Sequence, residues 1–271
     1  MNNKLIIIGS GWLGRPLAKH LNTQGYQVTA TTTQAKNCIN TPGELAIVQL
    51  DTTNPAKTET TLSSLAPSTM IIAIPPARTN PNYLNSLMVL SQAAKKAKIQ
   101  RVIFISSSSV WGDNIGRVDE TTTPLPTTDS AKAMVRFEQH LQQQTDFLAT
   151  TLCLTGLFNA QRHPGQFLAG REDVANPDAP VNMIHQQDCI GLITNLLKQA
   201  SWQNIYIGCA PSHPTRKAFY SYGANQLGLA APQFQLTGGI NAKVIDAQAT
   251  AKALNYDYVF PDIIKALSLP S

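Results

Sequence analysis

A glycine-rich turn near the start of the chain constrains its fold more than any other feature of the sequence. Residues 4–14 read KLIIIGSGWLG, so an apolar run is followed by Gly9, Gly11 and Gly14 in the spacing G-x-G-x-x-G. In dinucleotide-binding folds the first glycine permits a tight exit from a strand, the second lets backbone approach a pyrophosphate, and the third lets a helix pack on the strand. We therefore predict a pyrophosphate site here, against the alternative of a bare strand-to-helix turn. Its residues are Gly9, Ser10, Gly11, Trp12, Leu13 and Gly14.

Strand-like and helix-like segments alternate along the first 155 residues. Strands are predicted at residues 5–8, 27–30, 46–50, 70–74, 101–105 and 147–154. Helices are predicted at residues 16–23, 83–97 and 130–143. Alternation of this kind is typical of α/β proteins with a parallel sheet and helices on both faces. We therefore predict a Rossmann fold, which is a doubly wound parallel sheet.

The loops at the carboxyl ends of the strands are where such a sheet binds its ligand. These loops are Gly9 to Gly14, Thr31 to Lys36, Asp51 to Thr53, Pro75 to Thr79 and Ser106 to Asp113. Beyond the glycine turn and the second strand, the predicted cofactor contacts are Asp51, Ile74, Pro75, Pro76 and Ser106.

The end of the second strand distinguishes NAD from NADP, because an acidic side chain there would accept hydrogen bonds from the adenosine ribose. The chain has Thr31, Thr32, Thr33 and Lys36 at this point, and its first acidic residue is Glu44. Hydroxyl groups and an ammonium suit a 2′-phosphate, and a charge-assisted hydrogen bond is worth about 1.5–3 kcal/mol. We therefore predict that NADP(H) is preferred, with NAD(H) still possible. The alternative is a solvated loop with no 2′ contact.

The length of 271 residues fits one α/β domain and a smaller appended region. We assign residues 1–155 and about 185–207 to the dinucleotide-binding domain. A further helix is predicted at 188–197, in the segment that is assigned to the dinucleotide-binding domain. Residues of about 156–184 and 208–271 are assigned to a substrate-covering region, with helices predicted at 215–227 and 246–254. Asp246 is the expected N-cap of the last of these helices.

Composition excludes several classes of protein. The net charge of +5 is spread along the chain without a basic run, so we expect no nucleic-acid binding. The four cysteines never form C-x-x-C and the five histidines lack ligand spacing, so we expect reduced core cysteines and no metal. No stretch approaches 20 apolar residues, so we expect a soluble, cytoplasmic protein with no membrane partner.

Several segments together resemble the extended short-chain dehydrogenase/reductase superfamily, which contains nucleotide-sugar epimerases and dehydratases. The segments are GSGWLG at 9–14, SSSSVWGD at 106–113, FEQHL at 137–141 and IHQQD at 184–188. The closing GWLG, the RHPG at 162–165 and the short C-terminal region are similar to an atypical, YeeZ-like branch. The resemblance implies NAD(P) binding, and a homodimer is common among such relatives. It also implies an adenine contact for Asp51.

The resemblance also locates the residues that would carry catalysis. Active members use a tyrosine and a lysine four residues later, and these places are held here by Ser130 and Met134. A shifted alignment puts Thr128 and Lys132 there instead, which keeps the lysine but still lacks the tyrosine. Serine is a poor substitute because its proton is far less acidic than that of a phenol. General acid/base assistance supplies about 10²–10⁴-fold in rate, so its loss would leave cofactor binding with little catalysis.

A serine run offers what remains of an active site. By resemblance, Ser107 takes the place of the superfamily's catalytic serine or threonine. The acidic pair of active dehydratases is replaced by Ser108 and Ser109, so acid/base elimination is disfavoured. Trp111 stands where a tyrosine is common, and it is expected to pack or to contact the substrate. The candidate catalytic residues are Ser107, Ser108 and Tyr83.

Three residues have both a functional and an ordinary interpretation, and a fourth has only a functional one. Arg162 and His163 could clamp a phosphate or carboxylate, or they could belong to a turn fixed by the following Pro-Gly. Tyr83 could donate a proton, or it could pack on the sheet at the start of a helix. Lys243 is a candidate for binding a substrate anion.

Two functions remain open. The first is an NADP(H)-dependent oxidoreductase or epimerase that acts on a small anionic or nucleotide-sugar-like substrate, with Ser107 orienting the reacting oxygen. The second is a catalytically silent dinucleotide-binding module that senses cofactor state or docks a partner. The missing tyrosine and lysine favour the silent module, while the serine run and the Arg162 loop favour the enzyme.

Overall fold

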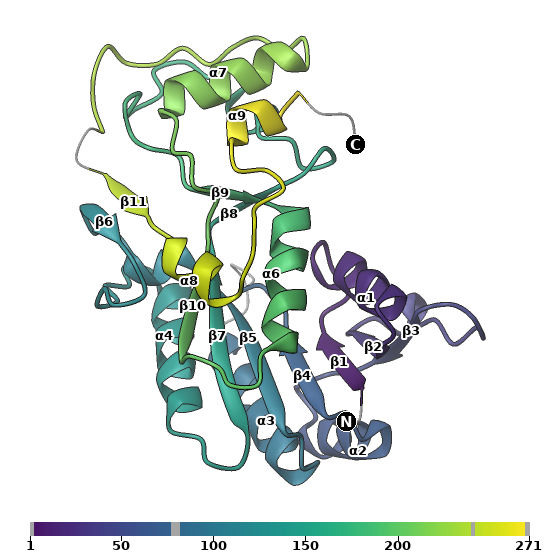
Figure 1. Cartoon of the computed structure of the whole chain (residues 1–271). Helices are drawn as coiled ribbons and strands as arrows, with labels where there is room; N and C mark the ends of the chain where they lie inside the picture. Colours follow the sequence, from purple (N-terminus) through teal and green to yellow (C-terminus); the bar gives the residue numbers. More distant parts are fainter. Residues whose placement is uncertain (1–2, 77–81, 240–241, 269–271) are drawn as a thin grey trace. The chain divides into compact units, whose positions relative to one another are not determined.

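A seven-stranded sheet in the order β3-β2-β1-β4-β5-β7-β10 carries the fold (Figure 1). The computed structural model describes residues 3–76, 82–239 and 242–268. The strands are β1 (Lys4–Ile8), β2 (Gln27–Thr32), β3 (Ala46–Gln49), β4 (Thr69–Ile72), β5 (Arg101–Ser107), β7 (Leu148–Leu154) and β10 (Ile205–Gly208). Strand β1 pairs in parallel with both β2 and β4, so the strand order reverses beside it. This confirms the predicted Rossmann fold, in which ligands bind where the order reverses.

The chain divides into two compact units. Unit 1 comprises Met1–Ser107, Thr128–Leu152 and Gln199–Ile205. Unit 2 comprises Ser108–Thr127, Cys153–Lys198 and Tyr206–Ser271. Unit 2 therefore takes in residues 108–127 and the helix at 186–198, which the sequence assigned to the dinucleotide-binding domain. The functional division into cofactor-binding and substrate-covering parts stays a prediction.

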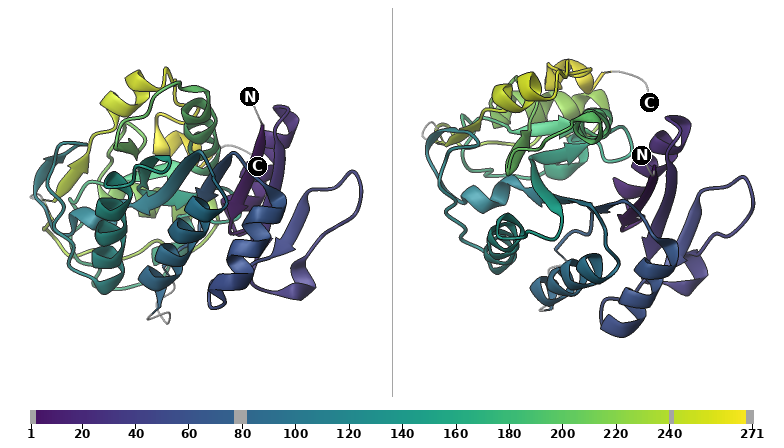
Figure 2. Two further views of the ribbon diagram at one scale, coloured as in Figure 1. Left: turned by 90° about the horizontal axis from the view of Figure 1, so that it is seen from below. Right: turned by 60° about the horizontal axis from the view of Figure 1, so that its bottom comes forward.

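Four helices in the described part of unit 1 accompany its strands. They are α1 (Gly14–Thr23), α2 (Pro55–Leu65), α3 (Tyr83–Lys96) and α4 (Asp129–Gln142). Helix α3 packs between α2 and α4, and Figure 2 shows these three side by side on one face of the strands. Helix α1 packs on β1 and β2, where its buried residues Leu17, Ala18 and Leu21 recur at helical spacing. The core beneath these helices includes the apolar residues 5–8 and 70–72.

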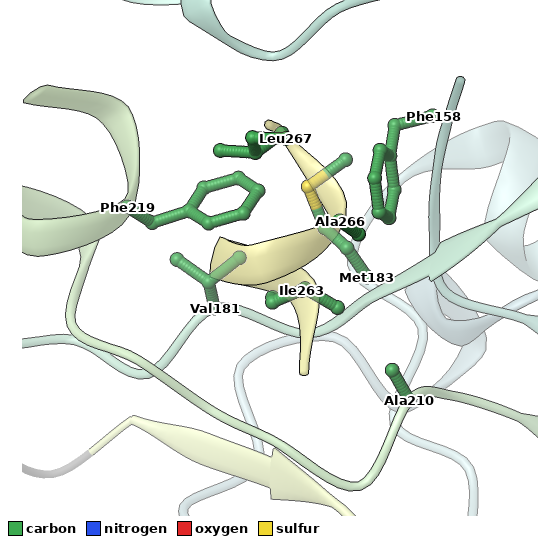
Figure 3. Close-up of a cluster of buried hydrophobic side chains, with 8 residues drawn as sticks. All are labelled: Phe158, Val181, Met183, Ala210, Phe219, Ile263, Ala266 and Leu267. Atoms are coloured by element: carbon green, nitrogen blue, oxygen red, sulfur yellow. The ribbon is translucent and has the colours of Figure 1, made fainter. Parts of the chain in front are cut away.

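Unit 2 is built from short elements around its own apolar cluster. Parallel pairs are formed by β6 (Gly116–Val118) with β11 (Lys243–Ile245) and by β8 (Gly156–Phe158) with β9 (Met183–His185). Its helices are α5 (Gly165–Leu168), α6 (Gln186–Lys198), α7 (Arg216–Gln226), α8 (Gln248–Ala253) and α9 (Ile263–Ala266), together with the 3₁₀ turn η2 (Ser108–Trp111). Figure 3 shows the cluster, which consists of Phe158, Val181, Met183, Ala210, Phe219, Ile263, Ala266 and Leu267.

Two glycines let α5 and α7 lie close together in unit 2. A Cβ atom on Gly165 would lie 2.1 Å from the carbonyl oxygen of Gly223, far inside van der Waals contact. The approach of these two helices therefore depends on the absence of side chains at the contact.

The structure corrects three details of the sequence interpretation. Helix α2 was not predicted, although Asn54 caps it through Lys57 N–H and Pro55 occupies its first turn. Asp246 is not the N-cap of α8, because that position is Ala247. Cys38 is exposed, whereas the other three cysteines are buried as expected.

Neither a membrane-spanning helix nor a metal-type cluster is found in the described ranges. No helix within residues 3–76, 82–239 and 242–268 is both long enough and apolar enough to cross a bilayer. The same residues contain no group of three or more His, Cys, Asp and Glu side chains suited to a metal ion.

Candidate functional site

The glycine turn between β1 and α1 has the backbone geometry that its sequence predicted. Gly9 has a φ of +104°, and a Cβ there would lie 3.0 Å from the carbonyl oxygen of Ala73. A Cβ on Gly14 would lie only 1.8 Å from the carbonyl oxygen of Gly9, so the helix can follow the strand this closely only with glycine. A Cβ on Gly11 would meet no described protein atom within 4 Å. The turn therefore leaves open space at Gly11, where a ligand can approach the backbone.

The helix that follows this turn begins without a side-chain cap. The N-cap residue Leu13 accepts no hydrogen bond through its side chain, and the first turn of α1 contains no acidic residue. Because uncapped backbone N–H groups and the helix dipole favour an anion, this end of α1 suits a pyrophosphate.

Thr31 ties the turn to the end of β2. Its hydroxyl accepts the Gly9 N–H over 3.0 Å, and its carbonyl accepts the Ser10 N–H over 2.8 Å. The side chain is buried, with 2% of its surface exposed. Thr31 therefore positions the glycine turn. Of the other residues in this group, Thr33 and Lys36 are exposed, whereas Thr32 is half-buried.

The two loops at this edge differ in how far their polar groups are already used. The carboxylate of Asp51 accepts both the N–H and the hydroxyl of Thr53, which holds the pKa of Asp51 below its usual range. The Lys36 ammonium lies in the 3₁₀ turn η1 (Ala35–Asn37) and takes part in no ion pair with a described residue. The Asp51 carboxylate is thus already held by hydrogen bonds, whereas the Lys36 ammonium has no ion-pair partner among the described residues.

The loop after β4 is held by Tyr83 at the start of α3. The Tyr83 hydroxyl donates to the carbonyl oxygen of Ile74 over 3.2 Å, and its side chain is buried. Burial and the charge of Glu138 raise the pKa of Tyr83 well above its ordinary value. The burial and the hydrogen bond fit the packing role that was the alternative for Tyr83. Because its pKa is raised, Tyr83 is also a poor proton donor at neutral pH. Pro75 and Pro76 follow Ile74, whereas residues 77–79 of this predicted loop lie outside the described residues.

A buried carboxylate lies beneath the serine run at the end of β5. The hydroxyl of Ser106 donates to Glu138 of α4 over 2.5 Å, and both side chains are buried. Ser107, the last residue of β5, is half-buried beside this pair. In the sequence Glu138 is visible only as part of a motif, because its link to Ser106 spans 32 residues. Ser106 and Glu138 fix the strand end that carries Ser107.

Neither alignment of the missing tyrosine and lysine yields an acid/base pair in helix α4. Met134 is buried, and the Ser130 hydroxyl shares a hydrogen bond with that of Thr128 over 3.2 Å. Thr128 is the N-cap of the helix, while Lys132 is exposed and pairs with Asp129 over 3.6 Å.

Lys243 and Trp111 serve the structure of unit 2. The Lys243 ammonium donates to the carbonyl oxygens of Ser108 and Gly112, and burial lowers its pKa. Trp111 is fully buried, and its indole N–H donates to the carbonyl oxygen of Thr122 over 3.0 Å. Trp111 therefore packs, which leaves no surface for the substrate contact that was also expected of it. The Lys243 ammonium holds the loop in which Ser108 lies.

Arg162 and His163 do not form the paired clamp that the sequence suggested. Arg162 is exposed and lines a cavity of about 230 Å³, whereas His163 is buried and lines a different cavity. The Nδ1 atom of His163 accepts the Gly165 N–H, and Nε2 donates to the carbonyl oxygen of Leu267 over 3.3 Å. His163 thus anchors the loop, and of the two residues Arg162 is the one placed to meet a ligand in the smaller cavity.

A second arginine, missed from the sequence, lines the same cavity as Arg162. Arg216 is the first residue of α7, where a cation opposes the helix dipole. That unfavourable placement is the sequence feature from which Arg216 could have been identified as a candidate site residue. The Nε atom of Arg216 is buried and has no hydrogen-bond partner among the described residues.

Comparisons with known proteins agree with this architecture. The sequence profile of the NAD dependent epimerase/dehydratase family matches residues 5–166. Protein YeeZ of Escherichia coli (strain K12) is 35% identical over 269 residues, which cover 96% of this chain and 97% of that protein. A UDP-glucose 4-epimerase from Thermotoga maritima, solved with UDP-glucose, has a TM-score of 0.82 at 14% identity, covering 98% of this chain and 96% of its own. A UDP-glucose 4-epimerase from Thermus thermophilus, solved with NAD, has a TM-score of 0.78 at 15% identity, covering 97% of this chain and 98% of its own.

Proposed function

Because the chain belongs to the NAD dependent epimerase/dehydratase family, we propose that it binds NADP(H) and catalyses hydride transfer with a small anionic substrate. The geometry of the glycine turn carries this proposal. Gly9 and Gly14 are in close contact, and the space in front of Gly11 is open, as a bound pyrophosphate requires. A bound nicotinamide supplies or accepts the hydride.

The preference for NADP(H) rests on the charge at the end of β2. No acidic residue precedes Glu44, so no carboxylate of β2 can accept from the ribose hydroxyls. Thr33 and Lys36 are exposed just beyond the strand and offer a hydroxyl and an ammonium to the 2′-phosphate. The expected gain is about tenfold to a hundredfold in affinity over NAD(H).

The proposed role of Ser107 is to orient the reacting oxygen of the substrate. The Ser106–Glu138 hydrogen bond fixes the end of β5, so a hydroxyl at Ser107 is held by a rigid strand. The tyrosine and lysine of related enzymes have no counterpart in Ser130 and Met134. The proton donor is therefore a group other than the usual pair, and Tyr83 is ill suited to it because its pKa is raised.

Cofactor titration tests the first half of this function. Calorimetry with the purified protein should give a lower dissociation constant for NADPH than for NADH. Lys36→Ala should raise the NADPH value and leave that of NADH unchanged, because only NADPH has the 2′-phosphate. Lys19→Ala, which removes an exposed lysine of α1, is the charge-matched control. Equal constants for the two cofactors in the wild-type protein would refute the preference.

A turnover screen tests the second half. Nucleotide sugars and small carbonyl acids are added with NADP⁺ or NADPH while the absorbance of the reduced cofactor is followed. Turnover that Ser107→Ala abolishes, with cofactor binding retained, supports the enzyme.

The second candidate function is a silent dinucleotide-binding module. It is favoured by the burial of Met134 and by the exposed ion pair of Lys132, which together leave α4 without an acid/base pair. Tight binding of NADPH with no turnover over the whole panel would support this module and refute the enzyme.

A further inference from the structure

We infer that the cavity between Arg162 and Arg216 in unit 2 is a binding site for a phosphate monoester dianion. The inference rests on the proposed function in one respect, namely that the phosphate belongs to the substrate. The site itself is argued from unit 2 alone.

An unsatisfied donor is the first observation. The Nε atom of Arg216 is buried without a hydrogen-bond partner, and this arginine forms no salt bridge with a described residue. Leaving a buried donor unpaired destabilises the folded protein, and the effect is larger for a charged group. Such a group in a native protein calls for an explanation, and a missing anionic ligand supplies one.

The charge of the cavity is the second observation. Its described lining contains the guanidinium groups of Arg162 and Arg216 and no acidic residue. Two guanidinium groups balance the charge of a dianion, and their planar donors match the oxygen atoms of a phosphate.

The surroundings strengthen the attraction. Val181 and Met183 line the cavity and also belong to the apolar cluster of unit 2 (Figure 3). The Arg216 guanidinium lies 5.6 Å from the ring centroid of Tyr220, which further shields it from water. An ionic hydrogen bond beside an apolar core is stronger than one in water, because the local dielectric constant is lower.

The loop that carries Arg162 is held in place by hydrogen bonds within unit 2. The Arg162 N–H donates to the side-chain oxygen of Asn159 over 2.8 Å, and Asn159 in turn donates to Gln186 over 3.0 Å. His163 anchors the other side of the loop through Leu267. The Gly165–Gly223 contact brings this loop close to α7, whose first residue is Arg216. Two segments far apart in the sequence thus place the two arginines at one cavity before any ligand binds.

The size of the cavity limits the ligand. At about 230 Å³ it is smaller than the roughly 300–1,000 Å³ of pockets that enclose drug-sized ligands. We therefore expect a compact phosphate ester and not the whole of a nucleotide sugar.

Calorimetric titration with inorganic phosphate and with glycerol 3-phosphate, without dinucleotide and at constant ionic strength, tests the site. Arg216→Gln and Arg162→Gln should each weaken binding by about tenfold to a hundredfold, the value of a charge-assisted hydrogen bond. Lys217→Gln is the matched control, since it removes the next positive charge from a residue that does not line the cavity. Binding of glycerol 3-phosphate should also weaken below pH 6, because the second pKa of a phosphate monoester is about 6.

Several results would overturn the inference. These are no binding of either phosphate compound, equal losses in Arg216→Gln and Lys217→Gln, or stronger binding of acetate than of phosphate. Circular dichroism checks that each variant folds, and Arg216→Lys, which keeps the charge, should retain part of the affinity.

NADPH affinity separates this inference from the proposed function. Arg216→Gln should leave the NADPH dissociation constant unchanged, and a large rise would mean that the cavity takes a cofactor phosphate instead. Wild-type protein that binds NADPH but not phosphate refutes only the cavity. Protein that binds phosphate but no pyridine dinucleotide refutes only the cofactor proposal.

Discussion

The hydroxyl of Thr31 accepts the backbone N–H of Gly9 over 3.0 Å, which joins the end of β2 to the glycine turn after β1. Glycine adopts the positive φ of Gly9 about as readily as a negative one, so the surrounding contacts decide which orientation its backbone takes. A threonine that the sequence predicts as a ligand contact therefore acts on the shape of the binding loop.

Thr31→Val should weaken binding of NADPH and NADH by the same factor. Valine keeps the shape of threonine but leaves the Gly9 N–H without its acceptor, at a cost of about 1–3 kcal/mol. Calorimetry of both cofactors measures the effect. Thr33→Val is the comparison, since an exposed hydroxyl at the proposed position of the 2′-phosphate should affect NADPH alone. A Thr31→Val loss confined to NADPH would contradict the positioning role.

Ser106→Ala should destabilise unit 1 by about 1–3 kcal/mol, because the buried Glu138 carboxylate loses a hydrogen-bond donor. Urea unfolding of Ser106→Ala, Glu138→Gln and the double variant gives the coupling energy. The two sites share a hydrogen bond, so a non-additivity of about 0.5–3 kcal/mol is expected. Strict additivity would mean that the pair contributes nothing to stability.

The elements that the sequence predicted well are those encoded locally. The strand predicted at residues 5–8 is an apolar run, and the turn after it needs glycine for reasons of backbone geometry alone. Helix α2 escaped prediction because its sequence PAKTETTLSSL is rich in threonine and serine and has only a weak apolar face. The N-cap residue Asn54 and the first-turn residue Pro55 nevertheless indicate the start of a helix in the sequence.

The partners of the site residues could not be predicted in the same way, because they come from distant segments. Glu138 meets Ser106 across 32 residues. The sequence pairs Arg162 with its neighbour His163, but the fold turns one toward a cavity and buries the other. Adjacent residues in a loop often point in different directions, and only tertiary packing decides which of them faces a ligand.

Stability should fall as the pH is lowered from 7 toward 4, in part because of His185. Burial lowers the pKa of His185 to about 4, and its Nδ1 accepts the Gln187 N–H, which requires that atom to be unprotonated. The unfolded chain binds this proton near pH 6.5. Between about pH 6.5 and 4 the unfolded state therefore holds more protons, so the free energy of unfolding rises with pH in this window.

Urea unfolding at several pH values measures this slope. His185→Gln should flatten the dependence across that window, whereas His20→Gln, which replaces a half-buried histidine of α1, is the comparison and should leave it unchanged. An equal slope in His185→Gln and wild type would show that other groups carry the effect. His140 and His213 are further contributors, since burial lowers the pKa of each.

Gly165→Ala should both destabilise unit 2 and weaken phosphate binding. The added methyl group would lie 2.1 Å from the Gly223 carbonyl oxygen, so α5 and α7 must separate. Overpacking of this kind costs about 1–3 kcal/mol. Gly223→Ala is the graded comparison, because its Cβ would lie 3.1 Å from the nearest Gly165 atoms and needs only a small shift. The loop before α5 carries Arg162, and the start of α7 carries Arg216. A larger separation of these helices should therefore weaken phosphate binding more, so Gly165→Ala should have both a lower stability and a lower phosphate affinity than Gly223→Ala. Phosphate affinity equal to wild type in a folded Gly165→Ala protein would show that the helix contact does not set the distance between the two arginines.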